Sequence, residues 1–116
     1  MRVTSEKKGN CVVVEIGEAE VNLTVSDAFK ETVLDRYTSL GGGDLLLDLR
    51  QVNFMDSKAI GAMVAIRKAV AARKNRMGIC ELHPHVRKVV GVVTLGTIFE
   101  IFETRAEAVA AYGAGD

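Results

Sequence analysis

The sequence has few of the features that mark secreted, disulfide-stabilised or nucleic-acid-coating proteins. It contains only two cysteines, Cys11 and Cys80, too few for a disulfide scaffold, so we expect two reduced and buried thiols. Lys and Arg number 15 and Asp and Glu number 15, so the formal net charge is zero. A protein that binds nucleic acid over its whole surface is expected to be strongly basic. We therefore expect no direct nucleic-acid partner.

Long apolar segments are missing as well. The longest run without a charged residue, Val89 to Phe99, is far shorter than the roughly 20 residues that span a bilayer. The residues Met1 to Lys8 have no apolar stretch behind their charges, unlike a secretory signal. We expect a cytoplasmic protein with no membrane partner, in which Met1 to Lys8 and Gly113 to Asp116 are loosely ordered.

What is present is the composition of one globular domain. The 116 residues are 48% hydrophobic and 26% charged, which is enough apolar material for one core. Predicted strands cover Cys11–Ile16, Ala19–Val21, Asp44–Leu49, Met77–Leu82 and Phe99–Phe102, and predicted helices begin near Thr24, Ser57, Pro84 and Thr104. This alternation predicts an α/β fold with a mixed, mostly parallel sheet and about four helices. We expect a single domain over residues 1–116, with its core at about 8–112.

Two elements are expected to carry most of this core. The stretch Asp44–Leu49 is apolar without alternation, as in a central strand covered on both faces. The helix from Ser57 to about Asn75 has an apolar residue every three or four positions, which predicts one buried stripe. The members of this stripe are Ala59, Met63, Ile66 and Val70.

Several local features predict where the elements begin and end. Thr24 can cap the first helix, with Asp27 as its capping-box partner. Three glycines, Gly41 to Gly43, follow that helix and precede a strand, an order that favours a turn over a phosphate-binding loop. Gln51 to Met55 is predicted to be a loop. In the third helix the residues expected to face the core are Val86, Val89, Val90 and Val93.

Two clusters of functional residue types are better explained without a site. The spacing of Cys80, Glu81, His83 and His85 matches no familiar zinc pattern, and we expect no metal and no cofactor. The second cluster lies in the last half of the helix after Ser57, where cations complement the negative end of the helix dipole. It consists of Arg67, Lys68, Arg73, Lys74 and Arg76.

The candidate site is the start of the helix that follows the central strand. A short loop brings Asp56 and Ser57 to that position. One interpretation is structural, with Ser57 as the N-cap residue. The other is functional, because a small exposed hydroxyl at a helix N-terminus can accept a phosphate, whose negative charge that helix end favours.

The segment from Asp48-Leu49 through Phe54-Met55-Asp56-Ser57 to Gly61 resembles the signature of the STAS-domain anti-sigma-factor antagonists. In that family a strand ending in D-L leads through a loop to F-x-D-S and a glycine-bearing helix. Gly17–Glu20 is similar to the family's G-E-L-D turn. Pro84–Val89, Thr94 and Phe99–Thr104 resemble its C-terminal third, so that about residues 8 to 112 match in order and spacing.

The resemblance implies a regulatory binding module. Members of the family bind an anti-sigma factor that is also an ATP-dependent serine kinase, and this releases the sigma factor. The kinase then phosphorylates the serine of the D-S motif, here Ser57, and a separate phosphatase resets it. The chain is therefore expected to be a substrate and switch and not an enzyme. Partner contacts are expected from Glu20, Asp56, Lys58, Gly61, Ala65 and Lys68.

Three departures from the family pattern leave other functions open. Lys58-Ala59 replaces the usual small pair after the serine, Glu20 replaces an Asp, and Thr94-Leu95-Gly96 stands where T-G-L is common. The first departure is compatible with a STAS scaffold subunit that is not phosphorylated. A more remote alternative is a small α/β nucleotide-binding protein or a hydrolase that uses Ser57 as nucleophile, which needs a nearby base such as His83.

Overall fold

The computed structural model describes residues 1–94 and 99–113. Leu95 and Gly96 and the last three residues of the expected C-terminal tail therefore lie outside the described residues. The elements in chain order are β1 (Val3–Lys8), β2 (Cys11–Ile16), β3 (Glu20–Val21), α1 (Ser26–Ser39), β4 (Asp44–Asp48), β5 (Phe54–Met55), α2 (Ser57–Ala72), β6 (Met77–Cys80), α3 (Pro84–Thr94), β7 (Glu100–Phe102) and α4 (Arg105–Ala111).

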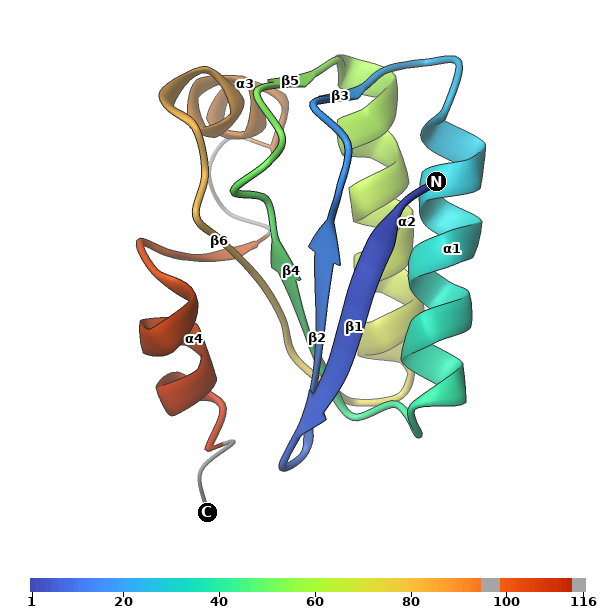
Figure 1. The fold of residues 1–116 in the computed structure, drawn as a ribbon, viewed down its shortest axis with the longest axis vertical. Coiled ribbons are helices and arrows are strands. Elements are labelled where there is room, and N and C mark those ends of the chain that lie inside the picture. Colours follow the sequence, from blue (N-terminus) through green and yellow to red (C-terminus); the bar gives the residue numbers. More distant parts are fainter. Residues whose placement is uncertain (95–98, 114–116) are drawn as a thin grey trace.

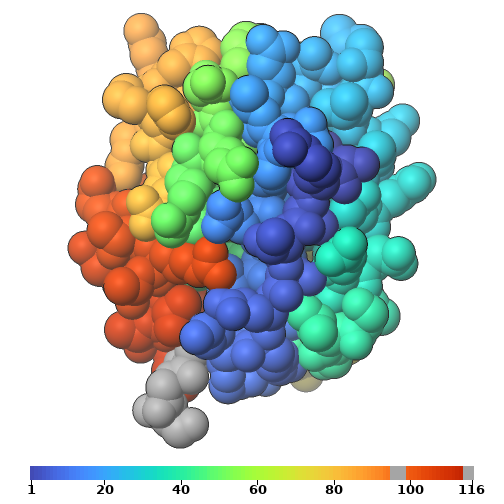
Figure 2. Space-filling model, in the orientation of Figure 1, coloured from blue at the N-terminus to red at the C-terminus, as the bar shows by residue number. Residues whose placement is uncertain are grey.

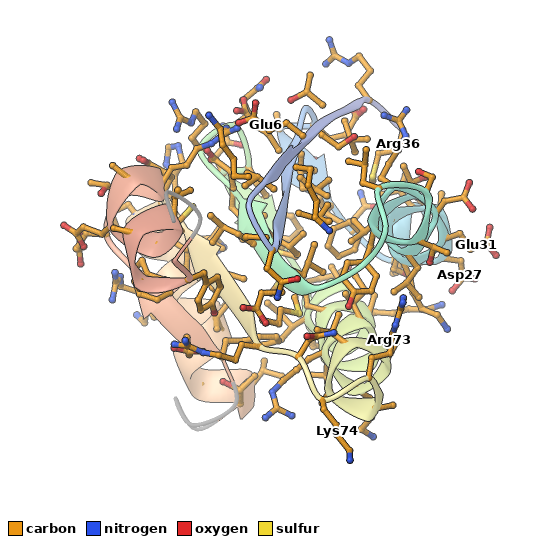
Figure 3. All side chains as sticks on the ribbon, turned by 90° about the horizontal axis from the view of Figure 1, so that it is seen from below. Glu6, Asp27, Glu31, Arg36, Arg73 and Lys74 are labelled. Carbon is orange, nitrogen blue, oxygen red and sulfur yellow. The ribbon has the colours of Figure 1, made fainter. Side chains whose placement is uncertain are left out.

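The predicted α/β architecture is confirmed, with four helices around a mixed sheet. Five strands form the main sheet in the order β1-β2-β4-β6-β7, and β3 and β5 form a separate parallel pair. Only β1 runs antiparallel to its neighbour in the main sheet. Figure 1 shows α1 and α2 side by side along one face of the sheet and α4 on the other, and Figure 3 shows the same layers from below. None of the helices within the described ranges has the length and apolar composition needed to cross a membrane.

The alternation of side chains along the strands divides the core between the two faces. Leu45 and Leu47 of β4 belong to the larger cluster, which includes the buried residues of α1, α2 and α3. Leu46 belongs to a smaller cluster with Ala108 and Tyr112 at the C-terminal helix. The prediction that this strand is central and covered on both faces is therefore confirmed.

Two segments predicted to be irregular are strands. Met1 to Lys8 was expected to be loose, but residues Val3–Lys8 pair with all six residues of β2 in antiparallel register. The segment is polar because it is an edge strand and most of its side chains are exposed, so it lacks the apolar signal of a buried strand. In the predicted loop before Ser57, Phe54 and Met55 pair with Glu20 and Val21.

The first helix begins differently from its predicted start. The capping box of Thr24 and Asp27 is wrong, because the N-cap residue is Val25 and no side chain caps the helix. The hydroxyl and the backbone N–H of Thr24 instead donate to Oδ1 of Asn22, at 2.6 and 3.0 Å. This local turn occupies the side chain that would have capped the helix.

The third helix agrees with its prediction in part, and the glycine turn agrees fully. In α3, Val86 and Val90 are buried as predicted, but Val93 is 43% exposed, so its assignment to the core was wrong. The three glycines after α1 all have positive φ, which agrees with the predicted turn. A Cβ on Gly43 would lie 2.4 Å from the backbone oxygen of Asn10, so the β1–β2 hairpin also requires glycine there.

The predicted stripe of α2 is confirmed, since Ala59, Met63, Ile66 and Val70 are fully buried. We expect Ile66→Ala to lower the free energy of unfolding by about 2–5 kcal/mol, because it leaves a cavity in the core. Lys68→Ala, on the exposed side of the same helix, should change it by less than about 0.5 kcal/mol. Denaturant titration measures both, and equal midpoints for the wild type and Ile66→Ala would contradict the packing described here.

A network of charges joins the two ends of the chain to the centre of the sheet. The carboxylate of Asp48, at the end of β4, is fully buried and accepts hydrogen bonds from the guanidinium groups of Arg50 and Arg105. The shortest donor–acceptor distances are 2.8 Å from Arg50 and 3.2 Å from Arg105. Arg105 also donates to Glu15 of β2 at 3.0 Å and to Glu6 of β1 at 2.9 Å. Figure 2 shows β1 and α4 meeting on this face of the molecule.

We expect Arg105→Met to destabilise the fold by about 1–3 kcal/mol, because it removes one of the two cations on the buried Asp48 carboxylate. Arg87→Met is the matched control. Arg87 pairs with Glu103 at 2.8 Å, but both side chains are exposed, so this variant should cost less than about 1 kcal/mol. Thermal unfolding of both variants checks the difference, and equal losses would show that the buried network does not hold α4.

Candidate functional site

The Asp56-Ser57 pair lies where β5 passes into α2. Asp56 is the N-cap residue, with an extended backbone, and its Oδ1 accepts the backbone N–H of Ala59 at 2.9 Å. The interpretation of Ser57 as the N-cap is therefore wrong, and Ser57 is the first residue of the helix. Its side chain is exposed and makes no hydrogen bond with any described residue. The hydroxyl thus has no structural role in the described part of the chain.

Asp56 has a second contact that joins it to another segment. Its Oδ2 accepts the backbone N–H of Leu23 at 2.7 Å. Leu23 lies in the turn between β3 and α1. The strand before this turn, β3, pairs with β5, the strand before Asp56, so the two segments are also joined by strand pairing. Both carboxylate oxygens of Asp56 are therefore bonded to backbone N–H groups of the same chain.

The structure brings three of the expected contact residues into one groove between α1 and α2. Lys58 and Gly61 are exposed and Ala65 is half-buried. The groove is lined by Ser26, Asp27 and Lys30 from α1 and by Lys58, Gly61, Ala62 and Ala65 from α2. Figure 3 shows Asp27 and Glu31 projecting from the outer side of α1, away from the sheet.

Besides Asp56, two further expected contact residues, Lys68 and Glu20, lie outside this groove. Lys68 is exposed on α2 but does not line the groove. Glu20 is exposed on β3, in register with Phe54. It therefore lies beside the short strand that leads to Asp56 and Ser57.

The packing of the protein does not require glycine at position 61. A Cβ built at this position has no heavy atom within 4 Å beyond its own neighbouring backbone. A glycine inside a helix costs about 1 kcal/mol relative to alanine. No packing contact within the protein explains why the helix carries this penalty at Gly61. The open space there allows another molecule to approach the helix backbone closely.

Some members of the two remaining clusters of functional residue types make structural contacts. His85 stacks on Phe54, with ring centroids 5.7 Å apart, and Glu81 accepts the backbone N–H of Arg105 at 2.9 Å. Across residues 1–94 and 99–113, no group of three or more His, Cys, Asp or Glu side chains is arranged to hold a metal ion. At the lower end of α2, Arg73 lies over the ring of Tyr37, 5.3 Å from its centroid.

The two cysteines are buried and free, as predicted. Burial, together with the nearby carboxylate of Asp44, raises the pKa of Cys11 to about 11. Burial and the carboxylate of Asp48 raise the pKa of Cys80 to about 12. Both thiols therefore stay protonated at neutral pH and are poor nucleophiles.

The family model of the STAS domain matches residues 2–108. The chain belongs to the STAS domain family. A protein of Thermotoga neapolitana, whose name describes it as an anti-sigma factor antagonist, is 29% identical over 97 residues, which are 84% of this chain and 86% of that protein.

Solved structures show the same fold. A crystal structure from Thermotoga maritima, described as an anti-sigma factor antagonist, has a TM-score of 0.86 at 22% identity and covers 96% of this chain and 94% of its own. The anti-sigma factor antagonist SpoIIAA in its unphosphorylated form has a TM-score of 0.75 at 17% identity, covering 97% of both chains. These structures confirm the fold, and the match of the STAS domain model confirms the family predicted from the D-S motif and the surrounding pattern.

This STAS domain carries two exposed apolar side chains beside Asp56 that the sequence did not single out. Leu23 is 61% exposed and Phe54 is 39% exposed. Phe54 belongs to the F-x-D-S motif, so that motif could have indicated it. For Leu23 the sequence has no such signal, because its proximity to Asp56 depends on the pairing of β3 with β5.

Proposed function

We propose that this STAS domain is an anti-sigma factor antagonist that binds a serine-kinase anti-sigma factor and is inactivated by phosphorylation on Ser57. The observation that carries the proposal is the exposed Ser57 hydroxyl, which follows a capping aspartate and has no bond of its own in the described chain. Family membership and the names of the relatives support the same role. The proposed role places the protein in the cytoplasm, where the kinase finds ATP.

The chemistry of the switch is supplied by the partner. The kinase transfers the terminal phosphoryl group of ATP to Oγ of Ser57, with its own base and Mg²⁺, so this chain is a substrate and not a catalyst. The phosphoserine adds about −1.5 to −2 charges beside the carboxylate of Asp56. Repulsion and desolvation of these charges within the contact surface then release the partner. A phosphatase acting on phosphorylated Ser57 restores binding.

A hydrolase with Ser57 as nucleophile has less support. Such an enzyme needs a base within hydrogen-bond distance of the serine. No described side chain bonds to Ser57, and His83, the base considered from the sequence, is among those that do not. A serine-directed fluorophosphonate probe should therefore leave this chain unlabelled.

Incubation with the cognate serine-kinase anti-sigma factor and MgATP should add one phosphate to Ser57. Mass spectrometry of tryptic peptides locates the group, and Ser57→Ala should take up none. The matched control is Thr24→Ala, which removes an exposed hydroxyl at the neighbouring turn and should be phosphorylated like the wild type. Phosphate on Thr24 in the wild type would contradict the assignment, and stable binding without phosphorylation would favour the scaffold alternative.

The docking surface is proposed to include Glu20, Asp56, Lys58, Gly61, Ala65 and Lys68. Along α2 it follows the exposed side, where the open groove at Gly61 and Ala65 allows a partner backbone to come close. Lys58 lines that groove and Lys68 is exposed farther along the same helix, and both positive charges are suited to acidic groups on the partner.

We expect Ala65→Arg to lower kinase affinity tenfold or more, about 1.4 kcal/mol, because the long side chain holds the two surfaces apart. Thermal stability should change little, since arginine is a good helix former and the groove is open to solvent. Ala71→Arg, exposed on the same helix but outside the groove, is the control and should bind normally. Calorimetric titration measures both affinities. Full affinity of Ala65→Arg would show that the docking surface does not include this groove, and it would leave the assignment of Ser57 as the phosphoacceptor unchanged.

A further inference from the structure

Leu23 is an unusual residue to find at the surface turn before α1. Its side chain is 61% exposed, and among the described residues only Val92 is a more exposed large hydrophobic side chain. An exposed leucine in a turn contributes little to the core, and the neighbouring turn residues Asn22 and Thr24 are polar. The apolar side chain therefore has no structural role that its position explains.

The backbone of Leu23 is nevertheless held at two points. Its N–H donates to Oδ2 of Asp56 at 2.7 Å, across 33 residues of sequence. Its carbonyl oxygen accepts the hydroxyl of Ser26 at 3.3 Å. The bond from Ser26 is long and lies within the same turn, whereas the bond to Asp56 is short and has a charged acceptor. The carboxylate of Asp56 is therefore the main restraint on the backbone from which the Leu23 side chain projects.

Capping of α2 does not need this second contact. Asp56 caps the helix through Oδ1 and Ala59, and a serine or threonine at this position would do the same with one oxygen. Aspartate is the choice that satisfies the helix and also reaches Leu23. The Asp56 carboxylate thus ties the backbone of Leu23 to the start of α2, next to Ser57.

We propose that Leu23 is an apolar contact of the kinase-docking surface and that Asp56 is the positioning residue that holds it there. The inference rests on the proposed function. A kinase that encloses the Ser57 hydroxyl in its active site must also come close to the segment bonded to Asp56. Beyond any contact of its own, Asp56 acts on the partner through Leu23, because one carboxylate oxygen holds the Leu23 backbone and the other caps α2. Binding that removes the exposed apolar surface of Leu23 from water favours the complex.

The first test concerns the restraint and needs no partner. Asp56→Ser keeps a good N-cap but is too short to reach Leu23. In amide hydrogen exchange, the Leu23 N–H of this variant should exchange about tenfold faster than in the wild type, since it loses its acceptor. The Ala59 N–H, still capped, serves as the internal control and should keep its rate. Unchanged exchange at Leu23 would overturn the positioning role.

The second test is a double-mutant cycle on kinase affinity, measured by calorimetry with a non-hydrolysable ATP analogue so that no phosphate is transferred. The probe is the serine-kinase anti-sigma factor that phosphorylates Ser57 in the preceding mass-spectrometry experiment. Leu23→Ala should weaken binding about tenfold, and Asp56→Ser should weaken it to a similar extent. Because Asp56 acts through Leu23, adding Asp56→Ser to Leu23→Ala should weaken binding by less than about twofold more.

Val92→Ala is the matched control, since it trims an aliphatic side chain that is 69% exposed on α3. It should bind like the wild type. If the two substitutions are additive, or if Leu23→Ala binds normally, the inference is wrong while the proposed function stands. If the wild type itself does not bind the kinase, the proposed function fails and this inference fails with it.

Discussion

The fold depends on the burial of β4 from both sides. Leucines of this strand point alternately to the α1–α2 side and to the α4 side, so both faces of the sheet must be covered. Where the strand ends, the charge of Asp48 is removed from water and must be balanced within the protein. Arg50 comes from the following loop, and Arg105 comes from the start of α4. Because Arg105 also reaches β1 through Glu6, one side chain joins the N-terminal strand, the centre of the sheet and the C-terminal helix.

This arrangement leaves the start of α2 available for binding. The helix is fixed by its buried stripe and by the Asp56 cap, and neither involves the side chain of Ser57. Gly61 fills no packing requirement, and Leu23 is mostly exposed. Residues without a structural role therefore collect at one end of α2, where a rigid helix and a paired strand hold them in place. A charge added at Ser57 would alter this surface while leaving the core and the Asp48 network intact.

Prediction from sequence succeeded where a segment's own pattern decides its structure. The apolar run at Leu45 to Leu47 and the periodic stripe through Ile66 carry that information within a few residues. It failed where the structure of a segment depends on pairing with a remote strand, or where a local hydrogen bond replaces the expected one. The edge strand β1 is polar, and its place in the sheet comes from pairing with β2. Phe54 and Met55 form a strand only because Glu20 and Val21 lie beside them, and Thr24 bonds to Asn22 instead of capping α1.

By itself, the sequence determined the alternation of strands and helices, the buried face of α2, and the family to which the D-S motif belongs. It also located Ser57 at a helix start, because the change from strand to helix periodicity is local. Only the tertiary structure decided that Arg105 meets Asp48 across 57 residues and that Leu23 meets Asp56 across 33. Such contacts depend on the order of strands in the sheet and on the path of each connection. Those are properties of the assembled chain and not of any segment, so no periodicity or spacing records them.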